Sequence, residues 1–309
     1  MLSDNIKKTV VYFDLFAYPL TSWEIWQWLW HDKNGGCKQD DWSEIKQVLD
    51  TLVAGQELGS KNGFYFLPGR QELVQLRQQR YRLAQRKYRL AQRATCWLRW
   101  LPFIKYIGVC NTLAYNNARV GSDIDLFIVT RQGRIWSARW WSAILMQLLG
   151  WRPNKRTAQD KICLSFFVTE HSLDLRDVRV KHDIYLYYWV AQLVPLYDPH
   201  NIQTQIDIVN RPWVSKNLPH YISVATPPPR LVQDWWVNRL GRLIFSTLAS
   251  LIPEFLLKSI QKIILPLNLR QLLNHGTSVI MNDQMLKFHD TDKREQYRDD
   301  WQKAWQTIL

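Results

Sequence analysis

Cysteine is scarce in this sequence and is not spaced for a structural role. The 309 residues include four cysteines, none of them in a CxxC pair or close to a histidine: Cys37, Cys96, Cys110 and Cys163. Structural zinc sites and disulfide frameworks need closely and regularly spaced ligands or partners. The spacing therefore argues against both kinds of protein, and it favours a reducing compartment.

Long apolar runs are also missing. The most apolar region, residues 240–269, is interrupted by four charged residues, Arg242, Glu254, Lys258 and Lys262. Its longest uncharged run, 243–253, has 11 residues, whereas a membrane-spanning helix needs about 20. We expect no transmembrane segment but a packed amphipathic helix, with contact to a membrane surface as the alternative. The first residues lack the apolar core of a signal peptide, so the expected location is cytoplasmic.

Positive charge is abundant, with a formal net charge of +13 at pH 7. An excess of this size indicates an anionic partner rather than a particular fold. More than half of it falls in residues 70–93, where eight basic residues stand against one acid, Glu72. The remaining composition, 47% hydrophobic and 22% charged, is ordinary for a globular protein.

A single long helix is predicted over residues 70–100, which contain neither glycine nor proline. Its centre repeats one heptad almost perfectly, RYRLAQR (80–86) followed by KYRLAQR (87–93). The spacing predicts a narrow apolar stripe formed by Leu76, Leu83, Leu90 and Trp97, with Ala84, Ala91 and Ala94 beside them. We favour a connecting helix with solvated arginines. The alternative is a basic surface that binds nucleic acid or a triphosphate.

Residues 1–69 have the pattern of three helices followed by a hairpin. Helices are expected at 5–17, from Thr21 through Trp30, and at 42–55, with a loop around Asn34-Gly35-Gly36 after the second. Trp23, Trp26 and Trp30 are expected on one face of that second helix. The hairpin is expected at 58–67, turning at Asn62-Gly63.

This order is that of a winged helix. The stretch FAYPLTSWEIWQWL (16–29) resembles the opening of winged-helix modules fused to nucleotidyltransferases. The resemblance implies DNA binding, but the third helix carries Glu44 and Asp50 against Lys46. Because phosphate contact needs a basic face, we expect the module to serve packing or protein contacts rather than to read DNA.

From residue 103 onward the periodicity changes. Strand-like runs at 106–110, 123–130 and 161–169 surround an apolar helical stretch at 135–149. This alternation indicates an α/β or α+β domain that ends before the linker Pro227-Pro228-Pro229. Residues 230–309 are expected to be helical. The chain is therefore divided into four parts: 1–69, 70–102, 103–225 and 230–309.

The strongest chemical signal is the stretch CNTLAYNNARVGSDIDLFIVT (110–130). An apolar strand ends there, Asn111-Thr112 follow, and ten residues later comes Asp123-Ile124-Asp125-Leu126. No P-loop, Rossmann glycine motif or Ser-His-Asp spacing competes with it. The stretch resembles the signature of DNA polymerase β-like nucleotidyltransferases, in which a glycine-containing turn precedes an Asp-apolar-Asp-apolar strand. Taken alone, an Asp-x-Asp sequence also arises by chance.

The resemblance implies a metal site and a triphosphate site. Residues i and i+2 of a strand point to the same side, so Asp123 and Asp125 would together hold Mg²⁺ or Mn²⁺. These two residues would be the catalytic ones. The nucleotide, expected to be ATP, would be bound by the turn at Asn111 and Thr112, by Ser122 and by Arg119.

The sequence departs from the family pattern at two places. Asn111 replaces the glycine of the turn, and the third carboxylate, expected on the later strand, is not evident because KICLSFFV (161–168) contains no acid. Ser165 is one occupant of that place. The flanking acids are Asp160, Glu170 and Asp174, and only Asp174 has the local apolar-Asp-apolar pattern, so we assign it as the third metal ligand.

A second charged segment, KFHDTDKREQY (287–297), also resembles part of bacterial proteins that combine these two domains. With His289, Asp290, Asp292, Lys293 and Arg294 it has two interpretations. It either folds back on the active site or forms a solvated, charged helix start, and we favour the second.

These observations predict an α+β fold: a mixed-sheet nucleotidyltransferase domain flanked by a winged-helix-like module and a C-terminal helical region. The expected function is transfer of a nucleoside monophosphate from an NTP to an unidentified acceptor, using Mg²⁺. The alternative is a catalytically degenerate regulatory or nucleic-acid-binding protein, with nucleic acid bound through the basic helix 70–93.

Overall fold

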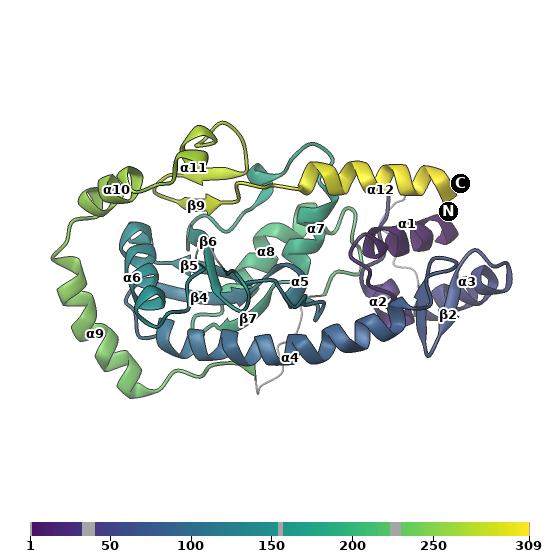
Figure 1. The fold of residues 1–309 in the computed structure, drawn as a ribbon, viewed down its shortest axis with the longest axis horizontal. Coiled ribbons are helices and arrows are strands. Elements are labelled where there is room, and N and C mark those ends of the chain that lie inside the picture. Colours follow the sequence, from purple (N-terminus) through teal and green to yellow (C-terminus); the bar gives the residue numbers. More distant parts are fainter. Residues whose placement is uncertain (1, 33–40, 154–156, 223–229, 309) are drawn as a thin grey trace.

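The computed structural model describes residues 2–32, 41–153, 157–222 and 230–308. It confirms the α+β class. A six-stranded mixed sheet has the strand order β7-β4-β5-β6-β9-β8, and a small antiparallel sheet has the order β1-β3-β2 (Figure 1). The expected loop at Asn34-Gly35-Gly36 and the linker at Pro227-Pro228-Pro229 lie outside the described residues.

The amino-terminal module follows the expected order. It consists of α1 (Leu2–Asp14), β1 (Leu20–Thr21), α2 (Ser22–Gln27), α3 (Trp42–Ala54), β2 (Gly59–Lys61) and β3 (Phe64–Phe66). The hairpin turns at Asn62-Gly63, where both residues have positive φ (55° and 78°), as such tight turns require. Thr21 caps α2, but the helix ends at Gln27. The expected tryptophan face is therefore wrong: Trp30 is buried beyond the helix, and Trp23 is 54% exposed.

The long helix α4 (Leu73–Leu98) lies along one side of the central sheet (Figure 1). Its buried positions include Ala84, Tyr88, Ala91 and Leu98. The small alanine side chains allow the helix backbone to lie close to the core that it covers. The expected leucine stripe is only partly correct: Leu83 and Leu90 pack against the core as partly buried residues, but Trp97 is 50% exposed.

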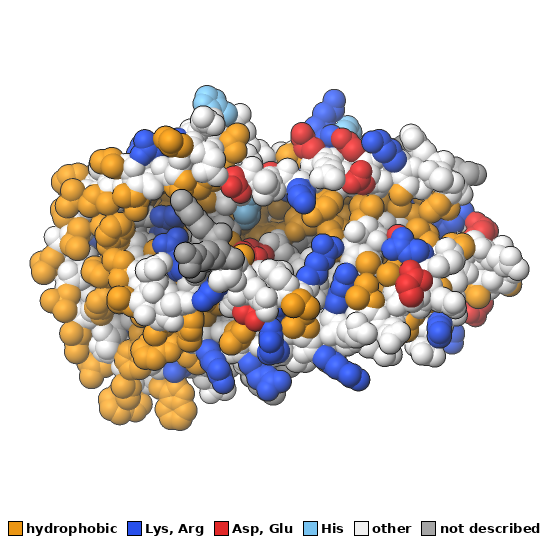
Figure 2. Space-filling view, in the orientation of Figure 1, with side chains coloured by type: hydrophobic (Ala, Val, Ile, Leu, Met, Phe, Trp, Pro, Cys, Tyr) orange, Lys and Arg blue, Asp and Glu red, His pale blue; other side chains and the backbone are white. Residues whose placement is uncertain are grey.

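The basic residues of α4 divide into two sets. Arg77, Arg80 and Lys87 point inward: Arg77 pairs with Glu24 at 2.7 Å, and Lys87 pairs with Asp160 at 2.9 Å. The other set is exposed and consists of Arg82, Arg86, Arg89 and Arg93; basic side chains line this edge in Figure 2. The expected basic surface thus exists, but part of the charge serves to fasten the helix to the rest of the chain.

The central sheet contains all three expected strands of the middle region. Its strands are β4 (Ile104–Val109), β5 (Ile124–Thr130), β6 (Ile162–Thr169), β7 (Val194–Tyr197), β8 (Val279–Met281) and β9 (Met285–Phe288). Strands β5 and β6 are parallel and the other neighbours are antiparallel. Residues 126–129 of β5 are buried on both faces, which explains their continuous apolar sequence.

Helices pack on both faces of this sheet, among them α6 (Ile135–Leu148) and α8 (Ile202–Val214). The helices that follow α4 in the described part of the chain are α5 (Asn111–Ala114), α6, the short 3₁₀ helix η1 (Arg176–Val178), α7 (Ile184–Ala191), α8, α9 (Trp236–Ser250), α10 (Glu254–Ile263), α11 (Leu267–Gln271) and α12 (Arg294–Ile308). The region 230–309 is mainly helical as expected. It also supplies the hairpin β8–β9, which pairs with β6, so the sheet extends beyond residues 103–225.

The amino-terminal module shares its core with the central domain. Tyr12 of α1 stacks on Tyr188 of α7 at 4.2 Å between ring centroids, and Phe16 contacts Tyr297 of α12 at 5.0 Å. A second core lies between the other face of the sheet and helices α4, α6 and α10. In the part of the chain described, no helix alone is long and apolar enough to cross a membrane. Helices α9 and α10 meet that criterion only as a pair, bent by 76°.

Candidate functional site

The carboxylates of the predicted motif lie where β5 begins. Asp123 immediately precedes the strand, and Asp125 is its second residue. In the parallel register Asp125 pairs with Cys163 of β6. One ligand atom from each of Asp123, Asp125 and Cys163 lies within 4.8 Å of the others. The two acids therefore share one place, as their i and i+2 spacing predicts, and a thiol stands beside them.

Burial shapes the protonation of this cluster. Burial, followed by the neighbouring charge of Asp123, raises the pKa of Asp125 to about 6. Burial also raises the pKa of Asp123. The pKa of Cys163 is well above its usual value because of burial and the two adjacent carboxylates. The thiol thus stays protonated at neutral pH, and the carboxylates carry negative charge that protein cations compensate only weakly.

Asn111 is fixed by two aromatic side chains. Its Oδ1 accepts hydrogen bonds from the Tyr185 hydroxyl at 3.0 Å and from Trp189 Nε1 at 2.8 Å. The amide nitrogen of Asn111 is thereby left to donate a hydrogen bond to the Asp125 carboxylate. This hydrogen bond lowers the pKa of Asp125. The backbone at Asn111 is left-handed (φ 57°), a conformation that glycine adopts freely and asparagine tolerates. Asparagine is therefore compatible with this turn, and its amide holds Asp125.

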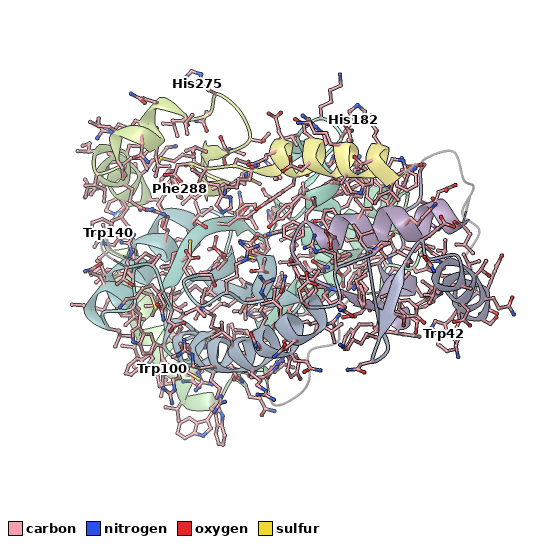
Figure 3. All side chains as sticks on the ribbon, turned by 45° about the vertical axis from the view of Figure 1, so that its right-hand side comes forward. Trp42, Trp100, Trp140, His182, His275 and Phe288 are labelled. Atoms are coloured by element: carbon pink, nitrogen blue, oxygen red, sulfur yellow. The ribbon has the colours of Figure 1, made fainter. Side chains whose placement is uncertain are left out.

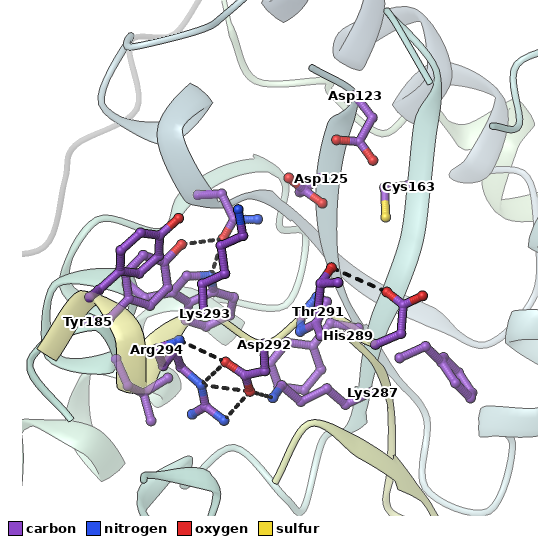
Figure 4. Close-up of a pocket in the computed structure, with 17 residues that line it drawn as sticks. Asp123, Asp125, Cys163, Tyr185, Lys287, His289, Thr291, Asp292, Lys293 and Arg294 are labelled. Atoms are coloured by element: carbon purple, nitrogen blue, oxygen red, sulfur yellow. Dashed lines mark hydrogen bonds and ion pairs between the residues drawn. The ribbon is translucent and has the colours of Figure 1, made fainter. Parts of the chain in front are cut away.

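The acids face a cavity of about 300 Å³. Its far wall is formed by residues 287–294 together with Tyr297, which come from the end of β9 and the start of α12 (Figure 4). The segment therefore folds back on the site. The favoured expectation of a solvated helix start is wrong at Lys287 and Arg294, which are only 4% and 5% exposed.

A buried ion network holds this wall in place. Arg294 donates to Asp292 at 2.6 Å and to Asp183, the N-cap residue of α7, at 3.0 Å. Lys287 also donates to Asp292, at 3.4 Å. The Arg294 hydrogen bonds and charge hold the pKa of Asp292 at about 2 against the effect of burial. Burial lowers the pKa of Lys287 to about 8, so it remains mostly cationic at neutral pH.

His289 and Lys293 have different roles in the wall. His289 Nε2 lies 3.1 Å from the hydroxyl of Ser165, and burial, with nearby Lys287, lowers the pKa of His289 to about 4. The imidazole is thus neutral, and Ser165 is engaged by it. Lys293 is exposed and lines the cavity, and its side chain extends toward Asp125 (Figure 4).

Three residues expected to bind nucleotide lie outside the lining of this cavity: Thr112, Ser122 and Arg119. The Ser122 hydroxyl donates to the Arg119 carbonyl at 3.0 Å, and the Ser122 carbonyl accepts from Lys87. Thr112 accepts from the backbone of Asn117 at 2.8 Å. Of the predicted nucleotide-binding residues, the structure brings only Asn111 to the acids.

Asp174 requires a correction, because the structure does not bring it to the cluster. Asp125 pairs with Cys163 near the amino end of β6, whereas Asp174 follows the carboxyl end at Thr169. Six residues of strand span about 20 Å. Asp174 instead accepts from the backbone of Arg176 at 2.9 Å. Cys163 occupies the place where a third carboxylate was expected.

Several residues of the site escaped prediction from the sequence. Tyr185 and Trp189 of α7 belong to an apolar helix and carry no motif, while Cys163 was set aside with the other isolated cysteines. The register of β6 beside β5 would have revealed Cys163, since equal spacing from the strand starts places it opposite Asp125. The segment 287–297 did carry a signal, its dense charge, but its position depends on the pairing of β9 with β6.

Comparison with known proteins identifies no family for this chain. No protein-family model, curated protein or solved structure matches it. Any function must therefore be inferred from the cluster at Asp123 and Asp125 and from the wall that faces it.

Proposed function

We propose that this protein transfers a nucleoside monophosphate from an NTP, expected to be ATP, to an acceptor, with Mg²⁺ or Mn²⁺ held by Asp123 and Asp125. The observation that carries the proposal is the pairing of these carboxylates at the start of a buried strand, facing a cavity whose opposite wall carries the exposed Lys293. The resemblance of residues 110–130 to DNA polymerase β-like nucleotidyltransferases supports the same reaction class.

The donor set fits a hard divalent cation. Mg²⁺ takes oxygen ligands and is commonly bound by one or two carboxylates together with substrate phosphates. Asp123 and Asp125 supply two carboxylates whose raised pKa values reflect uncompensated burial, a condition that a cation relieves. A protonated thiol is a poor ligand for Mg²⁺, so Cys163 would lie beside the ion without binding it. When bound, the cation supplies charge neutralisation at the phosphates.

The chain's own residues would position the nucleotide. Lys293 is exposed in the cavity and is free to approach a phosphate, whereas Arg294 and Lys287 keep the wall in place through Asp292. Asn111 orients the Asp125 carboxylate from the other side. His289 is neutral and buried, so it contributes shape and a hydrogen bond to Ser165 rather than charge.

A second candidate is a degenerate protein that binds nucleotide, or nucleic acid, without catalysis. Two observations favour it: Cys163 stands where a third carboxylate was expected, and the Asn111 side chain occupies the turn. The exposed arginines of α4 would serve nucleic-acid binding in either case. We place the protein in the cytoplasm, where NTPs are made, and Cys110 and Cys163 are free thiols.

The test uses full-length protein, labelled ATP, Mg²⁺ and cell extract. We expect label to be transferred by the wild type and lost with Asp123→Asn. Asp174→Asn is the matched control, because it removes the same charge outside the cavity. Equal labelling by wild type and Asp123→Asn contradicts the enzyme proposal. Mg²⁺-dependent ATP binding without transfer supports the degenerate alternative.

A further inference from the structure

Helices α9, α10 and α11 carry the largest group of exposed apolar side chains among the described residues. We call this group the α9–α11 patch. Seven of its members are between 64% and 77% exposed: Trp235, Trp236, Leu243, Leu251, Phe255, Ile263 and Leu267. Figure 2 shows hydrophobic side chains covering this end of the molecule. Contiguous apolar surfaces of this kind mark interaction sites on soluble proteins.

Helix α9 is apolar on both of its sides. Its inner side packs on the domain: the Phe245 and Trp141 rings are 5.3 Å apart, and a Cβ at Gly241 would lie 2.7 Å from the Trp100 ring. Figure 3 places Trp100 at this end of the molecule, opposite Trp42. A helix covering a core normally has a polar outer side; α9 packs on the domain as expected, but much of its outer side is apolar as well.

The outer side of α9 forms one continuous surface. Trp236, Leu240, Leu243 and Leu251 follow helical spacing of three, four and eight residues, and all four are exposed. The surface continues onto α10 and α11 through Phe255, Ile263 and Leu267. Two adjacent tryptophans, Trp235 and Trp236, stand at its start, and tryptophan is enriched where proteins meet the membrane–water interface.

Charge identifies the occupant of the patch. Residues 236–271 contain five basic side chains and one acid, Glu254. The Glu254 carboxylate is turned into the protein, where it accepts from the backbone of Trp136 at 3.1 Å. Among the exposed basic residues, Arg239 is paired with Asp234 at 3.5 Å, whereas Lys262 and Arg270 belong to no ion pair in the described part of the chain. An apolar surface with a basic fringe is complementary to a bilayer that contains anionic lipids.

We propose that the α9–α11 patch docks the protein on an anionic lipid surface. The helices lie on the membrane and do not cross it, because α10 is fastened to α6: Gln261 Nε2 donates to the Trp136 carbonyl at 2.9 Å. The 76° bend between α9 and α10 also keeps the two helices from forming one straight membrane-crossing segment. A second copy of the chain fits less well, since a two-fold contact would bring the basic fringes of both copies together.

The experiment is flotation of the full-length protein with vesicles of phosphatidylcholine and phosphatidylglycerol, compared with vesicles of phosphatidylcholine alone. We expect strong binding to the first and weak binding to the second, decreasing with salt. A Leu243→Ser/Leu251→Ser variant is expected to lose binding about tenfold or more, because two apolar side chains no longer enter the bilayer. Ile208→Ser is the matched control, since Ile208 of α8 is equally exposed at 65%.

The basic fringe has its own test. Lys262→Gln and Arg270→Gln are each expected to weaken binding about fivefold on anionic vesicles, whereas Lys303→Gln on α12 removes the same charge elsewhere and leaves binding unchanged. Two results overturn the proposal: absence of vesicle binding by the wild type, or equal binding by wild type and the Leu243→Ser/Leu251→Ser variant. A wild-type dimer in sedimentation analysis that this variant converts to monomer, without vesicle binding, assigns the patch to a second copy instead.

Discussion

Replacing Asp125 with asparagine is expected to stabilise the protein while removing a ligand of the proposed metal site. The pKa of Asp125 is raised from 3.8 to about 6 in the folded chain. A carboxyl whose pKa is raised by folding binds its proton more tightly in the native state. Its ionisation therefore destabilises the fold, and the penalty appears as pH rises from the unfolded pKa to the folded one.

The magnitude follows from the size of this shift. A difference of about two pKa units corresponds to about 3 kcal/mol of stability at neutral pH. We treat this value as an upper limit, since water reaches part of Asp125, and expect Asp125→Asn to raise the free energy of unfolding by about 1–3 kcal/mol. The gain should be present above about pH 6 and should shrink as the pH falls toward 4, because below the unfolded pKa the wild-type carboxyl is protonated in both states.

Urea unfolding in EDTA at two pH values measures the effect. Adding Mg²⁺ is expected to stabilise the wild type and leave Asp125→Asn unchanged, because ligand that binds only the folded state adds to its stability. Asp174→Asn, a change of the same kind at a residue outside the cavity, is expected to move stability by no more than about 0.5 kcal/mol. The reasoning is refuted if Asp125→Asn is less stable than the wild type near pH 7.5 in EDTA.

Three further outcomes are expected. Arg294→Met should lower the free energy of unfolding by about 3–5 kcal/mol, since it leaves the Asp183 carboxylate buried without its partner; urea unfolding checks this, and a loss below 1 kcal/mol argues against a structural network. Lys293→Ala should weaken Mg²⁺–ATP binding in calorimetry about fivefold or more without changing stability, whereas Lys303→Ala, farther along α12, should change neither. If nucleic acid binds α4, Arg89→Gln should reduce the slope of log affinity against log salt by about 1; an unchanged slope excludes that residue from the contact.

The parts of the fold that could be predicted are those whose signal is local. Strand β5 and helix α4 each carry their pattern within one continuous segment, an apolar run in one and an uninterrupted heptad repeat in the other. The hairpin β8–β9 was missed because its strands are only three and four residues long. Such short strands form through pairing with β6 rather than through their own propensity.

The candidate site divides in the same way. Asp123 and Asp125 were placed together correctly because the two-residue period of a strand is a local rule. Cys163 and Lys293 reach them through strand pairings that link distant segments, namely β5 with β6 and β6 with β9. Asp174 was misplaced for the same reason, since its local pattern contains no information on which end of β6 faces the acids.

The dependence of the cavity on β9 also sets an order of assembly during synthesis. The carboxylates at 123–125 leave the ribosome long before residues 287–294, which form the opposite wall. Until β9 pairs with β6, residues 166–168 present an unpaired strand edge, and the acids have no opposite wall facing them. A nascent or prematurely terminated chain would therefore hold both acids without a closed cavity, and completion of the sheet and completion of the site are a single event.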